Sequence, residues 1–509
     1  MDLLVTIDRA LAVPLYQQVY DGIRAAILDG RLPQGGRLPS RRELADRLGV
    51  ARFTVEDAYA RLVAEGYVAG RHGSGTFVSA TVLRGGEVDL ARHPESDGPD
   101  PPWRPSAWAE RLERVEASAG RSDGEPGYTY GPEHEAFDFD FRHGLPALDE
   151  APLAAWRRVL AREAAALPVA AHHYGEAGDR AGTPALRTAI AAYVARSRAL
   201  PCHPDQVIVT SSTRQGLDIL LRHAVEPGQA VAVEDPGYAA VRQAAAVHGA
   251  VVRPVPVDAD GLRFDDLLDR AGDAALLFVT PAHQFPTGGV LSLGRRIELL
   301  GWAARGRVLI VEDDYDAEFR YGERPLPALA GMAAGMGNHQ VVYAGTLSKT
   351  LFPALRMGYL VVPKPVVGSL SAARAAIDRE PPMITQMALA TFIAGGQFER
   401  HLTRMRRLYA RRRAALVSAL ATHFGARARR FLPGTAAGLH LLVEIDLPIA
   451  EGDLLARAAA ARIRLDGASP CFSHPPARPT LLLGYAGQPE DRIDAGIACL
   501  ARVLGVTSR

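Results

Sequence analysis

The sequence contains almost no lysine. Of its 58 lysine and arginine residues only Lys349 and Lys364 are lysines, and arginine occupies all the other positions. A guanidinium group stays protonated and is a poor nucleophile, so arginine cannot replace a lysine whose amine must react with a carbonyl. The two lysines are therefore the first residues to inspect. Lys364 lies between two prolines, a pattern typical of an exposed turn.

Cysteine is also rare, and long apolar runs are missing. The three cysteines, Cys202, Cys471 and Cys499, are far apart and show no metal-ligand spacing, so buried reduced thiols are expected. No run of about 18 apolar residues appears, which argues against a membrane-spanning helix. Charged residues at positions 2, 8 and 9 interrupt the first apolar stretch, which argues against a signal peptide. We expect a cytoplasmic protein that contacts no membrane.

The sequence has no excess of charge of either sign. Its 58 basic and 57 acidic residues give a formal net charge of +1. The whole molecule therefore does not attract nucleic acid, and any DNA binding must depend on a local patch. The contents of 48% hydrophobic and 23% charged residues are typical of a globular protein, and 509 residues suffice for two or three domains.

The first 80 residues have the pattern of a small helical unit followed by a hairpin. Ser40 is the expected N-cap of a short helix over residues 41–48, and a second short helix is expected over residues 52–65. Gly73–Gly75 lies between two strand-like runs and predicts a β-hairpin. Two short helices joined by a tight turn predict a helix-turn-helix, whose second helix can lie in the major groove of double-stranded DNA. A small helical domain that binds no DNA fits this pattern equally well.

Arginine gathers around the predicted turn and the hairpin tip. Its side chain suits both ion pairs with phosphate and bidentate hydrogen bonds to guanine. Acidic residues occur in the same unit, so the unit is not strongly basic overall. The basic residues of this region are Arg41, Arg42, Arg47, Arg52, Arg71 and His72.

Residues 81–137 have the composition of a linker. Glycine, proline, aspartate, glutamate and serine dominate, and the run Asp97–Pro102 breaks regular structure. One helix is expected inside this segment, near Ala107–Ala119. The expected organisation is thus a DNA-binding domain over residues 1–80, a linker over 81–137 and a large domain over 138–509.

Residues 138–509 alternate short β-branched runs with helical stretches rich in alanine, leucine and arginine. Runs such as Val207–Thr210, Leu276–Val279 and Val308–Val311 predict strands, and the alternation predicts an α/β fold with a mostly parallel sheet. Such sheets place their active sites at the carboxyl ends of the strands. The candidate residues of this domain all follow runs of this kind.

Lys349 follows a predicted strand, and its neighbours suit pyridoxal 5′-phosphate (PLP). The amine can form an imine with the aldehyde of the cofactor, and Thr346, Ser348 and Arg356 can hold its phosphate. A Ser-Lys pair alone would indicate only an exposed lysine, so the interpretation depends on the residues at other strand ends.

Three further strand ends complete the pattern. The run Val311–Asp316 provides a carboxylate for the protonated pyridine nitrogen and a tyrosine for the ring oxygen. The run Ser211–Gln215 places hydroxyls and backbone N–H groups at a helix N-terminus, which suits phosphate. Tyr238 offers a face that can stack on the ring. Acidic clusters also bind metal ions, but no histidine or cysteine completes such a site here, and no metal is expected.

Two parts of the chain resemble known families. Pro14–Val78, which includes LPSRRELADRLGVARFTVEDAYARL, resembles the winged helix of GntR regulators over its full length. Residues 138–509 resemble the fold-type I aminotransferases, and the whole chain is most similar to the MocR/GabR-type regulators, which fuse these two parts. The matching motifs include VEDPGY, VTPAHQFPTGGVL, VEDDYDAEFRY and YAGTLSKTLFPALRMGYL, in the order of the family.

The resemblance implies a fold and a role for single residues. The fold is α/β: an N-terminal winged helix-turn-helix, then a fold-type I PLP-dependent transferase with a mostly parallel sheet in its large domain and a smaller C-terminal α/β subdomain. The implied ring contacts are Lys349 (Schiff base), Asp313 (pyridine nitrogen), Tyr315 (ring oxygen), Tyr238 (stacking), and His283 and Gln284 (a loop beside the ring). The implied phosphate ligands are Ser212, Thr213, Arg214, Thr346, Ser348, Arg356 and Tyr174 of the partner subunit. The implied DNA contacts are Arg42, Arg52, Thr54, Arg71, His72 and Gly73.

The sequence departs from these families at a few positions. Glu56 stands where some GntR proteins have arginine, and Phe285 stands where many aminotransferases have asparagine. Ser212 replaces a frequent glycine of the phosphate loop. Leu482 occupies the place of the arginine that binds the substrate carboxylate in aminotransferases, and a buried leucine cannot pair with that charge. Arg478, which lies nearby in the sequence, is the alternative partner for a carboxylate.

The function implied by the resemblance is that of a PLP-dependent transcription regulator whose aminotransferase-like domain senses an amino compound or PLP itself. A domain-swapped homodimer that presents two heads to two half-sites is implied as well. Because of Leu482, transaminase activity is expected to be residual at most. Two alternatives stay open: an active aminotransferase with a regulatory DNA-binding head, and a partner-binding protein whose PLP pocket is inert.

Overall fold

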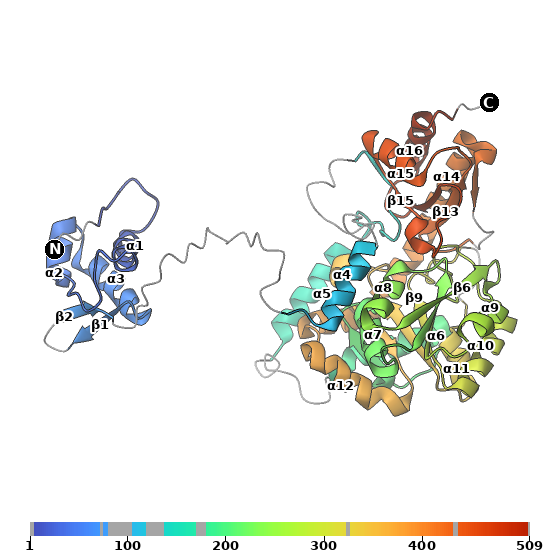
Figure 1. Ribbon diagram of the computed structural model, residues 1–509, viewed down its shortest axis with the longest axis horizontal. Coiled ribbons are helices and arrows are strands. Elements are labelled where there is room, and N and C mark those ends of the chain that lie inside the picture. Colours follow the sequence, from blue (N-terminus) through green and yellow to red (C-terminus); the bar gives the residue numbers. More distant parts are fainter. Residues whose placement is uncertain are drawn as a thin grey trace. The chain divides into compact units, whose positions relative to one another are not determined.

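The computed structural model describes residues 5–71, 75–79, 104–118, 137–168, 180–321, 326–430 and 436–506 (Figure 1). The chain divides into two compact units, Met1–Arg104 and Pro105–Arg509. Each unit has a hydrophobic core of its own.

The small unit consists of three helices and a two-stranded hairpin. Ser40 Oγ accepts a hydrogen bond from the backbone N–H of Glu43 (3.2 Å), and Gly49 ends the same helix in the left-handed conformation (φ +62°). Apolar side chains such as Ile23, Val55 and Leu62 are fully buried between the helices. This arrangement confirms the winged helix-turn-helix. Its elements are α1 (Leu15–Leu28), α2 (Arg41–Leu48), α3 (Arg52–Ala64), β1 (Val68–Arg71) and β2 (Gly75–Val78), the last two antiparallel.

Helix α4 (Ala107–Ser118) belongs to the large unit, where it packs on α8 (Ala239–His248). Arg111 Nε donates a hydrogen bond to the carbonyl oxygen of Val247 (2.8 Å). The helix expected near residues 107–119 is therefore present. The expected domain boundaries stay a prediction, since residues 80–103 and 119–136 lie outside the described part of the chain.

An eight-stranded sheet forms the centre of the large unit, with the strand order β4-β11-β10-β9-β8-β5-β6-β7. Strands β10, β9, β8, β5 and β6 run parallel, whereas β11 is antiparallel to both of its neighbours. The mostly parallel sheet is thus confirmed. The strands are β4 (Val207–Thr210), β5 (Ala230–Asp235), β6 (Val251–Asp258), β7 (Gly261–Leu262), β8 (Leu276–Val279), β9 (Leu309–Asp314), β10 (Val341–Thr346) and β11 (Gly358–Val361).

Helices cover both faces of this sheet. Side chains alternate along a strand, so Leu276 and Phe278 join one buried cluster and Leu277 and Val279 join the other. Near-continuous apolar strands are typical of sheets that are buried on both faces. One layer contains α7 (Thr213–Ala224), α8 and α12 (Val367–Asp378). The other contains α5 (Leu153–Ala166), α6 (Pro184–Arg198), α9 (Phe264–Ala271), α10 (Leu293–Gly306), α11 (Leu329–Gly335) and α13 (Met383–Ala394).

A second, antiparallel sheet near the C-terminus has the order β12-β13-β16-β15. It confirms the smaller C-terminal α/β subdomain. Its strands are β12 (Ala428–Arg430), β13 (His440–Ile445), β15 (Asp466–Gly467) and β16 (Thr480–Gly484), and β14 (Ile463–Arg464) pairs separately with β3 (Phe139–Asp140). The helices of this part are α14 (Gln397–His423), α15 (Glu451–Ala460) and α16 (Glu490–Val503). Short 3₁₀ helices are η4 (Pro204–Gln206), η5 (Pro353–Leu355), η6 (Lys364–Val366), η7 (Gly425–Arg427) and η8 (Ser469–Cys471).

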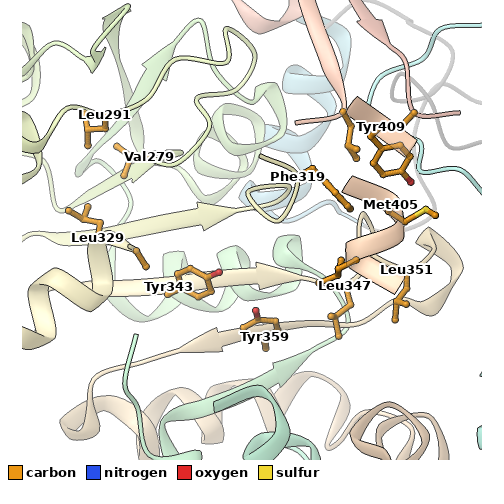
Figure 2. Packing of buried hydrophobic residues seen from close by; sticks show 14 of the residues in the cluster. Val279, Leu291, Phe319, Leu329, Tyr343, Leu347, Leu351, Tyr359, Met405 and Tyr409 are labelled. Atoms are coloured by element: carbon orange, nitrogen blue, oxygen red, sulfur yellow. The ribbon is translucent and has the colours of Figure 1, made fainter. Parts of the chain in front are cut away.

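One hydrophobic cluster connects the central sheet with the C-terminal subdomain. Figure 2 shows Tyr343 and Tyr359 on the sheet, and Met405 and Tyr409 on α14, as parts of this cluster. Phe319 lies between them and packs edge-on against the ring of Tyr409 (5.0 Å between ring centroids). This cluster therefore joins the central sheet and the C-terminal subdomain in one core.

Within the described ranges, no helix is long and apolar enough to cross a membrane. The same ranges contain no group of three or more His, Cys, Asp or Glu side chains arranged to hold a metal ion. All three cysteines are free thiols.

Candidate functional site

The candidate residues of the large unit meet at one edge of the central sheet. Asp313 and Tyr315 lie at the end of β9, and Lys349 follows the neighbouring strand β10. Tyr238 follows β5 and His283 follows β8. Because the carboxyl ends of parallel strands meet at the same edge, residues far apart in the sequence lie close together here.

Lys349 is held in an enclosed position. Its Nζ donates a hydrogen bond to the carbonyl oxygen of Gly144 (3.0 Å). The side chain is half-buried, and burial lowers the pKa of the amine from its usual range to about 7. Near neutral pH a large share of this amine is unprotonated, which is the form that attacks a carbonyl.

Asp313 provides a buried acceptor that lacks a donor. Its side chain is 7% exposed, and Oδ1 has no hydrogen-bond partner among the described residues. Burial, with smaller contributions from Asp314, Asp316 and Glu234, raises the pKa of Asp313 to about 8. A buried carboxyl group without a partner is costly, so the site lacks a donor that a bound group can supply. The protonated nitrogen of a pyridine ring has the required chemistry.

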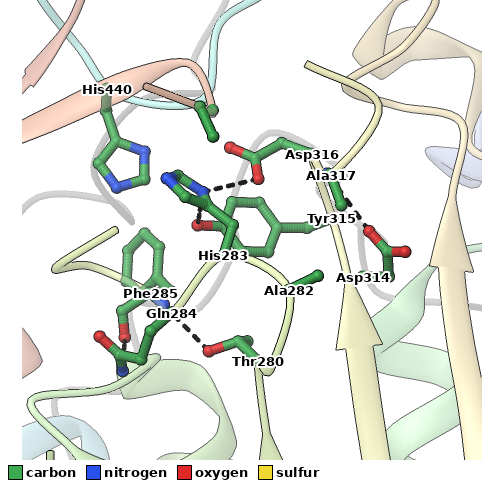
Figure 3. Close-up of polar contacts among 12 residues, drawn as sticks. Thr280, Ala282, His283, Gln284, Phe285, Asp314, Tyr315, Asp316, Ala317 and His440 are labelled. Carbon is green, nitrogen blue, oxygen red and sulfur yellow. Dashed lines mark hydrogen bonds and ion pairs between the residues drawn. The ribbon is translucent and has the colours of Figure 1, made fainter. Parts of the chain in front are cut away.

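Tyr315, His283 and Asp316 form a hydrogen-bonded chain (Figure 3). His283 Nδ1 lies 2.9 Å from Asp316 Oδ1 and 3.0 Å from the hydroxyl oxygen of Tyr315. An ionised Asp316 can only accept hydrogen bonds, so in that state His283 Nδ1 carries the proton. Its N–H then donates to Asp316 Oδ1 and to the hydroxyl oxygen of Tyr315. The hydroxyl proton of Tyr315 is then available for another acceptor, such as an oxygen on a bound ring. Burial keeps the pKa of Tyr315 well above its usual value, so the hydroxyl stays protonated.

The expected phosphate ligands come from three loops that the sheet brings together. In the strand register Gly358 is opposite both Thr210 and Thr346, which places the loops that follow β4 and β10 on either side of the start of β11. A Cβ atom on Gly358 would lie 3.0 Å from the carbonyl carbon of Ser212 and 3.1 Å from Thr210 Oγ1, so a side chain here would push these groups apart by a few tenths of an ångström. Arg356 comes two residues before Gly358, is exposed and has a left-handed backbone (φ +48°).

The expected phosphate ligands differ in the hydrogen bonds that they form within the protein. Ser212 is the N-cap of α7, and its Oγ accepts a hydrogen bond from the N–H of Gln215 (3.2 Å). Thr213 and Arg214 form the first turn of that helix, whose N-terminus favours an anion. Thr346 Oγ1 accepts from the N–H of Ser348 (3.2 Å).

Tyr238 packs against a separate apolar cluster of the large unit. Its ring packs edge-on against Phe285 (5.7 Å between centroids), and the cluster also contains Tyr315. Gln284 is buried and supports the loop, since its amide donates to the carbonyl oxygen of Pro236 (2.9 Å). Tyr174, the expected phosphate ligand of the partner subunit, lies outside the described residues.

The position expected for a carboxylate-binding arginine is apolar. Leu482 is 1% exposed and packs with Phe285 and Leu442. Arg478 is half-exposed and forms ion pairs with Asp446 (2.9 Å) and Glu444 (3.6 Å). Arg478, the alternative carboxylate partner, is thus already paired with two acidic side chains of the protein.

Several residues near this site were not expected from the sequence. His440 lies 6.4 Å from Tyr315 in a stacked arrangement, and His143 binds Asp466 through Nδ1 (2.6 Å). Glu234 is buried and accepts a hydrogen bond from the hydroxyl of Thr280 (2.5 Å). His143 and Asp466 are 323 positions apart, so no local pattern connects them.

The head presents polar and apolar groups along α2 and α3. Arg42 is exposed on α2, and Arg52 forms an ion pair with Glu56 (3.0 Å) while 70% of its side chain stays exposed. Thr54 is half-buried on α3. Phe53, between these two residues, is 69% exposed and was not among the expected contacts. The side chain of Arg71 and residues 72 and 73, the expected wing contacts, lie outside the described part.

Each of the two parts of the chain matches a known protein family. The gntR family of bacterial regulatory proteins matches residues 15–78, and the class I and II aminotransferases match residues 144–432. The probable rhizopine catabolism regulatory protein MocR of Rhizobium meliloti is 35% identical over 98% of this chain and 95% of its own length. The pyridoxine biosynthesis regulator PdxR of Corynebacterium glutamicum is 32% identical over 97% of this chain and 96% of its own.

A solved structure agrees with the fold of the large unit. LysN, the α-aminoadipate aminotransferase of Thermus thermophilus solved with a phosphopyridoxyl-leucine, is 27% identical. It covers 79% of this chain and 98% of its own, with a TM-score of 0.68. Because the full-length similarity extends over head and body together, the chain belongs to the MocR-type transcription regulators, in which a gntR-family DNA-binding domain is fused to a class I and II aminotransferase domain.

Proposed function

We propose that this regulator holds PLP at Lys349 and that ligand binding at this cofactor changes how the heads bind DNA. The observation that carries the proposal is the buried Asp313 Oδ1, which lacks a donor among the described residues and lies at the same sheet edge as Lys349, whose pKa burial lowers to about 7. A ring with a protonated nitrogen and an aldehyde would satisfy both groups.

The residues present fit PLP, which when bound supplies an aldehyde that can be joined to a primary amine. Lys349 would hold the aldehyde carbon, Asp313 the ring nitrogen and Tyr315 the ring oxygen, with Tyr238 and His283 beside the ring. These last two come from the apolar cluster and from the hydrogen-bonded chain of Tyr315. The proposed phosphate ligands are Ser212, Thr213, Arg214, Thr346, Ser348, Arg356 and Tyr174.

The proposed DNA surface comprises α3 and the hairpin. Arg52 and Thr54 lie in the first turn of α3, the part of a recognition helix that reaches base edges in the major groove. Arg42, on α2, suits a backbone phosphate. Residues Arg71, His72 and Gly73 are proposed for the wing.

A cytoplasmic, domain-swapped homodimer completes the proposal. Two heads related by a two-fold axis match two half-sites of an operator. Tyr174 is proposed to reach the phosphate of the neighbouring subunit. The segment 81–137 is proposed as the linker between a head over residues 1–80 and the large domain over 138–509, with α4 docked on α8.

The second candidate function is an active aminotransferase with a regulatory head. The favourable observation is that Asp313 and Tyr315 at the end of β9 and Lys349 after the neighbouring strand β10 lie at the same edge of the sheet. Against it, Leu482 is buried in an apolar cluster where a substrate carboxylate would need a cation. We therefore favour the sensor, with residual transaminase activity at most.

Reductive trapping tests the cofactor assignment. Purified protein is loaded with PLP, treated with borohydride, digested and analysed by mass spectrometry. The chain has only two lysines, so Lys364 is an internal control on the same molecule. We expect the phosphopyridoxyl mass on the peptide with Lys349, and its loss in Lys349→Ala but not in Lys364→Ala. Modification of Lys364 alone, or of neither lysine, contradicts the proposal.

A further inference from the structure

One face of the C-terminal sheet lies over the proposed cofactor site. Leu442 and Leu482 belong to the same cluster as Phe285, Tyr238 and Tyr315. In this antiparallel sheet Leu482 is opposite Leu442 on one side. It is opposite Asp466 on the other side. Since directly opposed residues of an antiparallel pair share a face, Asp466 points to the same side as the two leucines.

Asp466 lies on this face, and the strands that form it supply no lysine or arginine that could balance a ligand carboxylate. Strands β13, β15 and β16 contain neither lysine nor arginine. Asp466 is 6% exposed, and its Oδ2 accepts the N–H of His143 (2.9 Å) and contacts His143 Nδ1 (2.6 Å). No hydrogen bond reaches Asp466 Oδ1 from any part of the chain that the structure describes. One oxygen of a nine-tenths buried carboxylate is therefore left for a ligand.

His143 connects Asp466 with the reactive lysine. The next residue, Gly144, accepts the hydrogen bond of Lys349 Nζ (3.0 Å). The centroid of the His143 ring lies 5.7 Å from that of the Phe285 ring and 6.4 Å from that of the His440 ring. His440 adds no compensating charge, since burial, then His283, His143 and Lys349, keep its pKa well below the usual value.

We propose that this face binds the cationic end of a diamine, with Asp466 as the counter-ion of the ammonium group. The inference rests on the proposed function and specifies its amino compound: a primary amine whose far end is positively charged where an amino acid carries a carboxylate. Leu442 and Leu482 provide an apolar wall for the methylene chain between the two amines. A ligand carboxylate at this face would meet the carboxylate of Asp466, whose own oxygen already takes up the imidazole of His143, and two carboxylates together are unfavourable in a buried site.

Three probes with chains of similar length separate the possible far ends. Putrescine ends in an ammonium group, γ-aminobutyrate in a carboxylate and butylamine in a methyl group. Dissociation constants are measured by calorimetry, and by visible absorbance, on the full PLP-loaded chain. We expect putrescine to bind at least about tenfold more tightly than either of the others, which is ~1.4 kcal/mol.

Two variants assign the preference to Asp466. Asp466→Asn should weaken putrescine binding about tenfold or more and leave butylamine unchanged, because only the charged end loses its partner. Asp446→Asn is the matched control, since Asp446 directly follows β13, is half-exposed and pairs with Arg478. It should change neither constant.

Equal or tighter binding of γ-aminobutyrate overturns the inference, and so does an equal loss of all three probes in Asp466→Asn, which indicates a structural role. If Asp466→Asn does not fold, Leu482→Arg replaces it: a cation opposite Asp466 should lower the putrescine preference about tenfold or more, and an unchanged preference overturns the inference. Calorimetry can also measure the dissociation constant of putrescine on cofactor-free protein, so the role of Asp466 can be tested even if PLP does not bind. PLP trapped at Lys349 without a putrescine preference contradicts only this inference, whereas no trapping contradicts the proposed function.

Discussion

If PLP joins the chain at Lys349 as proposed, the pKa of Lys349 determines how fast the protein takes it up at each pH. Burial lowers this pKa to about 7, so the amine is about one-tenth neutral at pH ~6, half neutral at ~7 and nine-tenths neutral at ~8. A freely exposed lysine, with a pKa of about 10.4, is only ~0.04% neutral at pH ~7. The uptake rate of the protein should therefore rise about tenfold per pH unit below ~7 and level off above it.

Stopped-flow absorbance after mixing PLP with cofactor-free protein measures this rate. The free amine of N-acetyl-lysine amide is the reference under identical conditions, because it removes the titration of PLP itself from the comparison. The ratio of the protein rate to the reference rate should be constant below pH ~7 and fall about tenfold per unit from there to ~10, where the reference amine also becomes neutral. A ratio that stays constant over the whole range would refute the lowered pKa of Lys349.

Four further predictions address other parts of the account. Asp313→Asn should weaken PLP binding about 10- to 100-fold in an equilibrium titration, since a charge-assisted hydrogen bond is replaced by a neutral one. Ser40→Ala removes the N-cap of α2 and should destabilise the head by about 1 kcal/mol, measured by hydrogen exchange in residues 41–48. Arg198→Met leaves two buried carboxylates without their cation and should cost about 3–5 kcal/mol, seen as a large drop in the thermal midpoint. Phe53→Ala should reduce the preference for operators with a thymine at the contacted position by about tenfold in competition binding, because the exposed ring suits a thymine methyl group; an equal loss on all sequences would contradict this.

Local sequence patterns predicted the fold because each pattern reflects a physical requirement of a single helix, strand or turn. The cap at Ser40 and the stop at Gly49 define α2 within the range expected for it. Short apolar runs that alternate with helical stretches define the strands of the central sheet, which is covered on both faces. The residues around Lys349 follow strand ends, and the parallel topology alone is enough to place them at one edge.

Long-range pairs could not be predicted in this way. The contact of His143 with Asp466 and that of Lys349 with Gly144 join segments more than two hundred positions apart, 323 and 205 residues respectively. Their chemistry depends on how the C-terminal sheet packs over the central one. The same holds for the apolar surroundings of Leu482, which the sequence marks only as a missing arginine.

The central claim is that the state of Lys349 is transmitted to the heads. The most direct test is a DNA footprint and affinity measurement on the full chain, with and without PLP, for the wild type and for Lys349→Ala. We predict that PLP changes the footprint or the affinity of the wild type and has no effect on Lys349→Ala, while Lys364→Ala behaves like the wild type. An identical response to PLP in Lys349→Ala, or no response in the wild type, would contradict the claim.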